Sequence, residues 1–291
     1  MNTQITSLVE HINSTHGTDF VLNGKMERGV NGAYLLRSSR GVHILKPVGR
    51  TDLVEQVKRS ARIADYMNAP ASPTPRYQLM GFADGFGTWY VQEFLPGIPS
   101  PFPSHKLVEQ MVSMNDSQAG AAVDHHNDWS KAVDEALHDD AKGWQATIAA
   151  SGLDGQRLVR RCRELFEPFC SFKGGSADIV HGDFQHYNAL VDEHDTLTGY
   201  VDWPQAGCGD RSIDLARLLI DSWLAEKEFG RAAAQETFDL LKSRILLNSG
   251  PAGLNVYMAF WILQVGAFCV GWGDGAGYFK VADRVLSDLG V

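Results

Sequence analysis

Hydrophobic residues change their spacing early in the chain, from the period of a helix to that of strands. Apolar residues recur three or four positions apart over residues 5–12, which predicts a short amphipathic helix. The segments that follow alternate apolar and polar residues and are separated by glycine-containing turns, which predicts strands. These strands are expected over residues 20–27, 33–38 and 42–47.

A second amphipathic pattern begins near Thr51, a plausible N-cap, and predicts a helix that runs to about Met67. A proline-rich stretch over residues 70–75 stops it. Two further strands are expected at 77–82 and 88–94. Residues from about 20 to 95 therefore predict an antiparallel sheet with one inserted helix.

The pattern becomes mainly helical after the Leu-Pro-Gly break that begins at Leu95. Helices are expected over residues 105–121, 126–151 and 155–172, and again from positions near 211, 231, 253 and 278. We predict an α+β protein of two lobes: residues 1–95 form a small antiparallel β-sheet lobe, and residues 96–291 form a larger, mainly helical one.

Charge and composition narrow the classes of partner. The net charge of −9 over 291 residues argues against a general affinity for nucleic acid or for an anionic membrane. An acidic surface attracts cationic small molecules instead. The four cysteines form no Cys-x-x-Cys pair, and no secretion signal is visible, so we expect a cytoplasmic protein. The apolar stretch 256–270 is too short for a membrane span and predicts a buried helix.

A polar loop in the second half of the chain carries the strongest chemical signal. His181-Gly182-Asp183 is followed five residues later by Asn188, and Asp202 ends the next apolar run. This arrangement is typical of kinases, in which the first aspartate orients the acceptor hydroxyl and accepts its proton. Asn188 and Asp202 are candidate ligands of Mg²⁺, which prefers oxygen donors. His181 is expected to hold the loop by hydrogen bonding.

Other interpretations of this loop are weaker. A motif with three fixed residues arises by chance in roughly one protein in a few tens, so the pattern needs the following Asp202 strand to support it. A zinc site built from His181, His186 and His194 matches no common structural spacing. Neither a Gly-x-Ser-x-Gly elbow nor a P-loop motif is present, which removes two further enzyme classes.

The segment from 179 to 219 resembles the aminoglycoside phosphotransferase and choline kinase family. That family's loop reads His-Gly-Asp with Asn five residues after the Asp, then Asp-Trp, then Gly-Asp-x-x-x-Asp-Leu-Ala. This chain has Asp202-Trp203 and, from Gly209 to Ala216, the sequence Gly-Asp-Arg-Ser-Ile-Asp-Leu-Ala. The resemblance implies a bilobal protein-kinase-like fold over most of the chain.

The resemblance also implies residue roles. Asp183 would be the catalytic base, Asn188 and Asp202 the magnesium ligands, and Asp214 a structural brace for the loop. The short route from Asp202 to Asp214 leaves no room for the activation segment of a protein kinase, so we expect a small-molecule acceptor.

The first lobe should supply the nucleotide contacts. The turn containing Asn31 and Gly32 is a candidate phosphate loop, although a simple hairpin predicts the same residues. Lys46 ends a strand and is the candidate phosphate-binding lysine. The family pairs this lysine with a glutamate on the next helix, but Ser60 stands at the expected position. Either Glu55 pairs with Lys46 in a shifted register, or Lys46 lacks that partner.

The strand that ends near Gln92 and Phe94 resembles the family's hinge. There the adenine edge would bind to the backbone, although an edge strand followed by a Pro-Gly turn predicts the same residues. For the acceptor we select Asp221 and Asp274, whose carboxylates would suit a cation; solvated helix faces are the alternative.

These observations predict an ATP-dependent O-phosphotransferase that uses Mg²⁺, with GTP as an alternative donor. Its expected acceptor is a cationic antibiotic, an aminoglycoside or a basic peptide such as a tuberactinomycin, which would confer antibiotic resistance. The alternatives are a metabolic kinase of choline, homoserine or a sugar, a non-catalytic binding protein of the same fold, and a metal-dependent hydrolase. Monomer and homodimer are both compatible with the sequence.

Overall fold

The computed structural model describes residues 3–26, 32–49, 51–69, 73–122, 127–175 and 177–291. The chain forms two compact units. The first comprises Met1–Gly97 and Thr198–Pro204, and the second comprises Ile98–Leu197 and Gln205–Val291. The α+β class is confirmed, with a β-rich part followed by a mainly helical part. The sequence pattern did not predict that residues 198–204 belong to the first unit.

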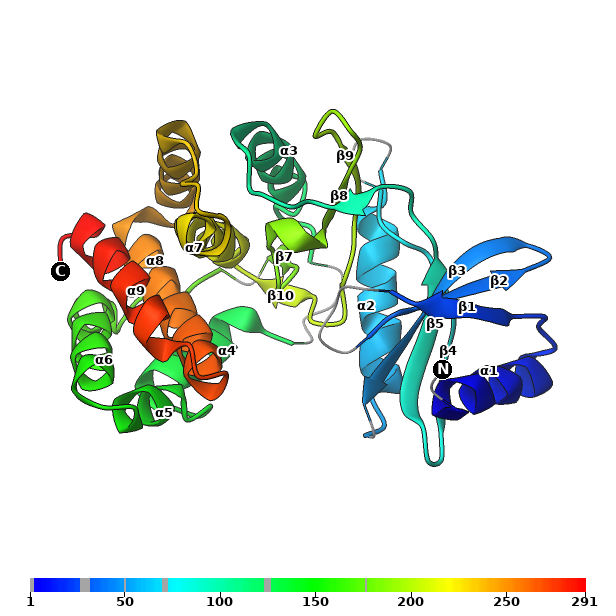
Figure 1. Ribbon diagram of the computed structural model, residues 1–291. Coiled ribbons are helices and arrows are strands. Elements are labelled where there is room, and N and C mark those ends of the chain that lie inside the picture. Colours follow the sequence, from blue (N-terminus) through cyan, green and yellow to red (C-terminus); the bar gives the residue numbers. More distant parts are fainter. Residues whose placement is uncertain (1–2, 27–31, 50, 70–72, 123–126, 176) are drawn as a thin grey trace. The chain divides into compact units, whose positions relative to one another are not determined.

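The first unit is built on a five-stranded antiparallel sheet with the strand order β1-β2-β3-β5-β4. Its strands are β1 (Val21–Lys25), β2 (Tyr34–Ser38), β3 (Gly41–Gly49), β4 (Tyr77–Ala83) and β5 (Gly87–Glu93). Helices α1 (Thr3–His16) and α2 (Val54–Met67) lie on opposite sides of this sheet (Figure 1). All five strands were expected from the sequence.

One face of the sheet packs against α1 to form the core of the first unit. Leu45 and its cross-strand partner Val91 belong to this buried cluster. Lys46, paired in register with Tyr90, is one position further along β3. Successive side chains of a strand point to opposite faces, so Lys46 projects from the face that α1 does not cover.

Helix α2 starts later than the sequence predicted. Thr51 is not its N-cap: the carbonyl oxygen of Thr51 accepts a hydrogen bond of 2.7 Å from the Thr88 hydroxyl, outside the helix. The N-cap residue is Leu53, and the carboxylate of Asp52 just before it accepts a hydrogen bond from the Val54 amide at 3.1 Å. A carboxylate at this end also suits the helix dipole.

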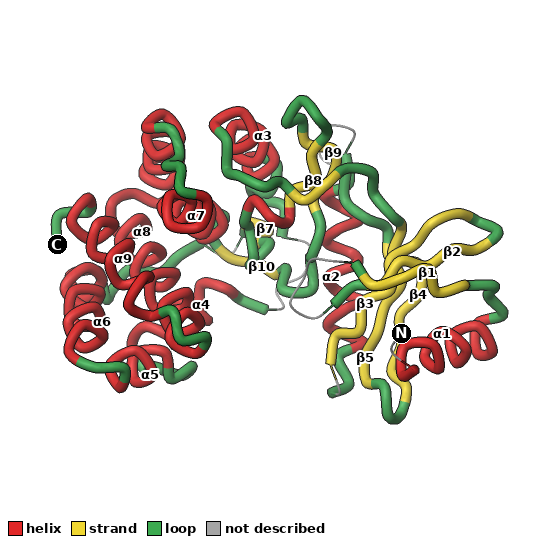
Figure 2. Tube along the Cα trace, viewed as in Figure 1, coloured by secondary structure: helices red, strands yellow, loops and turns green. Residues whose placement is uncertain are grey.

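The second unit is mainly helical, with short strands near the polar loop that contains Asp183 (Figure 2). Its longer helices are α3 (His105–Asp116), α4 (Trp129–His138), α5 (Trp144–Ala150), α6 (Leu153–Phe166), α7 (Ser212–Phe229), α8 (Gln235–Gly271) and α9 (Gly275–Asp288). Two 3₁₀ helices are η1 (Glu167–Phe169) and η2 (His186–Asn188). The strands are β6 (Ile98–Pro99), β7 (Asp178–Val180), β8 (Ala189–Val191) and β10 (Gly207–Gly209), and β9 (Leu197–Tyr200) leads the chain into the first unit. Strand β7 pairs with β10, and β6 with β8, both antiparallel.

The single helix expected over residues 126–151 is wrong, because the chain breaks it into α4 and α5. Asp140 and Gly143 between them adopt left-handed backbone conformations, with φ of 47° and 67°. The Asp140 carboxylate then accepts hydrogen bonds from the amides of Gln145 and Ala146 at 3.0 and 3.1 Å. An aspartate that caps a new helix and a glycine at positive φ together favour the break.

Helix α8 is interrupted at Gly250, whose φ of 67° is non-helical, and Pro251 follows directly. Proline removes an amide donor and clashes with the preceding turn, which accounts for the kink. By length and composition this helix could cross a membrane, but 61% of its most apolar window is buried inside the structure. Burial of that extent is what a core helix shows, as the sequence predicted for residues 256–270.

Candidate active site

The polar loop emerges from the small sheet formed by β7 and β10 in the second unit. Gly182 in this loop has a φ of 81°, a conformation that L-residues rarely adopt. A Cβ atom at this position would lie 2.2 Å from the indole ring of Trp129. The positive φ and the lack of room for a Cβ atom both require glycine at this position. The backbone of the loop therefore packs directly against the Trp129 ring.

Asp183 is fixed by two amide side chains from its own loop. The Nε2 of Gln185 donates to both carboxylate oxygens of Asp183 at 3.0 Å. The Nδ2 of Asn188 donates to the main-chain oxygen of Asp183 at 2.8 Å and to its Oδ2 at 3.0 Å. The 3₁₀ turn η2 brings the fifth residue after Asp183 back onto it. Hydrogen bonds to a carboxylate are stronger than those between two neutral groups.

His181 lies inside the protein, in the position expected of a residue that orders the loop. Its side chain is buried, and its Nδ1 accepts a hydrogen bond from the Asp183 amide at 3.2 Å. An accepting Nδ1 places the proton of the neutral imidazole on Nε2.

Helix α7 braces the loop through three polar residues on one face. Asp214, Arg217 and Asp221 are spaced three and four positions apart, so they lie in one row. The row contacts the loop in order: Asp214 binds the amides of residues 181–182, Arg217 binds Gln185, and Asp221 binds His186. Of these three residues, only Asp214 was expected to brace the loop. A polar row on an otherwise buried helix was the signal for the other two.

Asp214 is fully buried and accepts three hydrogen bonds. The donors are the His181 amide at 2.7 Å, the Gly182 amide at 3.0 Å and the Nε2 of Gln118 at 2.9 Å. Burial raises the pKa of Asp214 to about 7, although these three donors act to lower it. The three donors set the path of the loop immediately before Asp183.

Asp221, selected from the sequence as an acceptor contact, lies inside the protein with 3% of its surface exposed. Its carboxylate accepts from the His186 amide at 3.0 Å, contacts the His186 ring, and lies 3.8 Å from Arg217. Burial alone would raise the pKa of Asp221, but His186 and Arg217 outweigh it and hold the pKa below its ordinary value. We correct the sequence interpretation: Asp221 braces the loop. Asp274, the other selection, forms an exposed ion pair with Lys227.

In the first unit, Lys46 forms an ion pair with Asp202, and its Nζ lies 2.8 Å from Oδ1. Asp202 adopts a φ of 71°, in the left-handed region, which costs a non-glycine residue roughly 1–2 kcal/mol. Strain of this kind concentrates at functional sites.

The strained segment is tied to the rest of the first unit on both sides. Before it, the Thr198 hydroxyl donates to the Pro96 carbonyl at 2.7 Å, and the Tyr200 amide donates to the Pro73 carbonyl at 2.8 Å. After it, the Gln56 side chain of α2 donates to the carbonyl of Pro204 at 3.1 Å. These contacts hold the Asp202 backbone in its costly conformation.

Glu55 does not pair with Lys46, so the shifted register, one of the two alternatives, is wrong. Its carboxylate lies on the exposed side of α2 and binds Lys58 of the next turn at 2.7 Å. Ser60, at the position where the family carries its glutamate, is buried, and its hydroxyl donates to the Gln56 carbonyl at 3.1 Å. Lys46 forms its ion pair with Asp202 instead.

The expected nucleotide contacts are described in part. Gly32 has a positive φ of 71°, and Asn31 lies outside the described residues. Gln92 is buried within β5, while Phe94 beyond the strand is 39% exposed. The amide of Glu93 between them donates to the Arg76 carbonyl at 2.9 Å.

Within the described residues, no group of three or more His, Cys, Asp or Glu side chains could hold a metal ion. Magnesium needs fewer protein ligands because it keeps several waters. The Asn188 nitrogen is occupied by Asp183, which leaves the amide oxygen as the donor atom of this side chain. The Asn188 oxygen and the Asp202 carboxylate are both donors of the kind that magnesium binds.

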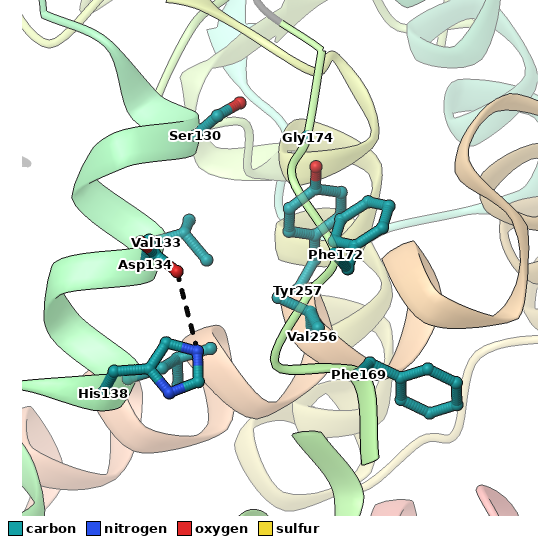
Figure 3. A pocket seen from close by; sticks show the side chains of 10 residues that line it. Ser130, Val133, Asp134, His138, Phe169, Phe172, Gly174, Val256 and Tyr257 are labelled. Carbon is teal, nitrogen blue, oxygen red and sulfur yellow. Dashed lines mark ion pairs between the residues drawn. The ribbon is translucent and has the colours of Figure 1, made fainter. Parts of the chain in front are cut away.

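A small pocket in the second unit lies between α4, α8 and the chain after η1 (Figure 3). Asp134 and His138 face each other across one turn of α4 at 3.6 Å, and the remaining lining is mostly apolar. No predicted site residue lines this pocket. It is separate from the loop residues, and we assign it no part in the chemistry.

Comparison with known proteins places the chain in a family. The model of the phosphotransferase enzyme family matches residues 27–246, well over half of the sequence. A thermostable mutant of aminoglycoside phosphotransferase APH(4)-Ia, in a ternary complex with ADP and hygromycin B, superposes with a TM-score of 0.71 at 16% identity; the match covers 98% of this chain and 99% of that one. Curated proteins yield no match.

Two other solved structures share the fold. Macrolide 2'-phosphotransferase MphH from Brachybacterium faecium gives a TM-score of 0.60 at 17% identity, covering 96% of this chain and 97% of its own. An aminoglycoside-3'-phosphotransferase of type VIII gives 0.56 at 18% identity, covering 89% and 100%.

Proposed function

Because this chain belongs to the phosphotransferase enzyme family, we propose that it transfers the γ-phosphoryl group of ATP to a hydroxyl of a cationic antibiotic. The observation that carries the proposal is the carboxylate of Asp183, fixed by Gln185 and Asn188 in a glycine-containing loop. A general base must be held within hydrogen-bond reach of the proton it accepts, and this carboxylate is held on two sides.

Asp183 would orient the acceptor hydroxyl and accept its proton. The hydroxyl oxygen forms a bond to the γ-phosphorus, the bond from that phosphorus to the bridging oxygen breaks, and ADP leaves with the bonding electrons. The route needs no covalent enzyme intermediate. Positioning and electrostatic stabilisation supply the acceleration in such reactions.

Asn188 and Asp202 are each a candidate magnesium ligand, as the family resemblance implies, because each side chain carries an oxygen of the kind that this ion prefers. When bound, the ion neutralises charge on the phosphates. Lys46 would bring a further positive charge to the triphosphate, and the backbone near Gln92 and Phe94 would receive the adenine edge. The strained backbone of Asp202 supports this assignment, since strain is retained where function needs it.

Several observations favour a cationic acceptor. The chain carries a net charge of −9, which attracts cations. APH(4)-Ia, similar in fold, was crystallised with hygromycin B.

We further propose a cytoplasmic protein, because Cys162, Cys170, Cys208 and Cys269 are free thiols.

The experiment that tests the proposal measures ADP release from ATP and Mg²⁺ across a panel of acceptors. The panel contains aminoglycosides, a tuberactinomycin, a macrolide, choline, homoserine and simple sugars, and mass spectrometry checks each product for an added phosphoryl group. Turnover of cationic antibiotics supports the proposal. Turnover of choline, homoserine or a sugar alone identifies a metabolic kinase, and phosphate release without any acceptor indicates a hydrolase.

The ion pair of Lys46 leads to a prediction about two charged residues. Replacing Lys46 with Met should lower kcat/KM for ATP roughly 10- to 100-fold, as expected for loss of one charged hydrogen-bond partner. Replacing Glu55 with Gln should leave kcat/KM within about twofold, because its partner is the exposed Lys58. Steady-state kinetics with varied ATP checks both. A large loss in Glu55→Gln would restore the pairing that the family resemblance implied.

A further inference from the structure

Gln185 contacts the proposed base and a buried cation at the same time. Its Nε2 lies 3.0 Å from each carboxylate oxygen of Asp183, and its Oε1 accepts a hydrogen bond of 2.6 Å from Nη2 of Arg217. A guanidinium has donors only, so the amide oxygen must face Arg217. The amide nitrogen must then face Asp183.

Arg217 is itself fixed. Its side chain is 11% exposed, its guanidinium lies 5.5 Å from the centre of the Trp261 ring, and its Nη1 lies 3.8 Å from Oδ1 of Asp221. A planar guanidinium over an indole face is a favourable cation–π arrangement. Few alternative positions are open to a cation held in this way.

The same tryptophan connects back to the loop. Trp261 stacks on Trp129 with ring centres 6.2 Å apart, and Trp129 is the ring against which Gly182 is packed. Gly182 directly precedes Asp183, so the series of contacts that begins at Gln185 leads back to Asp183. The base is thus approached from its backbone through Trp129 and from its carboxylate through Gln185.

We propose that Gln185 is a positioning residue for phosphoryl transfer, and that Arg217 acts through it by fixing which end of the amide meets Asp183. This inference rests on the proposed function for its kinetic consequences, whereas the orientation of the amide can be tested without it. An amide turned the other way would set its oxygen against the carboxylate and repel it. Small displacements of a catalytic group cost about 100-fold in rate per ångström.

The kinetic test uses ATP, Mg²⁺ and hygromycin B as the acceptor probe, and phosphate release with water as acceptor. We expect Gln185→Ala to lower kcat roughly 10- to 100-fold while KM for ATP changes less than about twofold. Gln185→Glu keeps the contact to Arg217 but places an anion against Asp183, so its kcat should be lower still at a similar melting temperature. The matched control is Gln235→Ala, which removes a surface glutamine that donates to Asp239. A kcat for Gln185→Ala within twofold of the unmodified protein, or equal losses in the control, would overturn the proposal.

A double-mutant cycle tests whether Arg217 acts through Gln185. Arg217→Met should lower kcat. The variant that combines it with Gln185→Ala should be no slower than the slower single variant, because both changes remove the same restraint on Asp183. Losses that multiply would show that Arg217 acts independently of Gln185. Because Arg217 also contacts Asp221, the melting temperature of the Arg217→Met variant is measured as well.

The side-chain amide of Gln185 gives a readout that needs no activity. Its ¹⁵N–¹H₂ signals, identified by their disappearance in Gln185→Ala, should shift in both Asp183→Asn and Arg217→Met. Signals unchanged in either variant contradict the proposed orientation. If no acceptor is phosphorylated, the proposed function fails, while these signals still decide the positioning proposal.

Discussion

Replacing Asp183 with Asn is expected to lower kcat for phosphoryl transfer about 10²- to 10⁴-fold, the range for loss of a general base. The amide keeps the size of the carboxylate but accepts no proton from the acceptor. It also offers a donor where Gln185 and Asn188 already donate, so one of these contacts at 3.0 Å must be lost. Rapid-quench measurement of ADP and phosphorylated product gives kcat directly.

Binding of ADP, measured by calorimetry, should change little in Asp183→Asn, because this carboxylate acts on the acceptor. The matched control is Asp239→Asn, an exposed aspartate of α8 whose contact is with Gln235. If antibiotic-dependent ADP release continues at the unmodified rate in Asp183→Asn, another group must be the base.

Replacing Asp214 with Ala is expected to reduce the free energy of unfolding by roughly 3–5 kcal/mol, because each of three buried donors left without an acceptor costs about 1–3 kcal/mol and the loop relaxes in part. Three donors lose their acceptor together: the amides of His181 and Gly182 and the side chain of Gln118. Thermal unfolding should show a melting temperature lower by roughly 6–15 °C. An unchanged melting temperature would mean that the loop finds other partners.

Asp214 also predicts how stability depends on pH. Its pKa is raised by burial from 3.8 to about 7 in the folded protein, so the folded state binds an extra proton between these values. The contribution of this protonation to the free energy of unfolding is fully present below pH 4. It is lost as the pH rises towards 7, with a slope of at most about 1.4 kcal/mol per pH unit. Asp214→Asn removes the titrating group, and the slope assigned to it should disappear from urea unfolding curves recorded at several pH values.

The regular part of the first unit could be predicted from sequence because its determinants are local. Strand alternation located the five strands, and the same alternation places Lys46 on the face that α1 leaves uncovered. The helix expected over 126–151 failed for a local reason too, since Asp140 and Gly143 were not recognised as a cap and a turn.

The surroundings of the proposed base depend on contacts between distant segments. Asp183 and Asn188 follow from the motif, but nothing near them in sequence indicates that Arg217 meets Gln185 through its guanidinium. The pairing of Lys46 with Asp202 likewise joins residues 156 positions apart, counted as 202 − 46. Such contacts are set by the tertiary fold, and of the two alternatives left open for Lys46 the structure supports the one in which it does not pair with Glu55.

The excursion of residues 198–204 into the first unit has a consequence for biosynthesis. Protein chains emerge from the ribosome from the amino terminus, and units fold as their residues become available. When Gly97 has been made, the first unit still lacks the segment that supplies the hydrogen bonds to Pro73 and Pro96 and the ion-pair partner of Lys46. It is completed only after Pro204 has been synthesised, by which time α3 to α6 and the loop at Asp183 already exist. The five strands of the first unit are all available once Glu93 has been made, whereas the unit as a whole is completed only after much of the second unit has been synthesised.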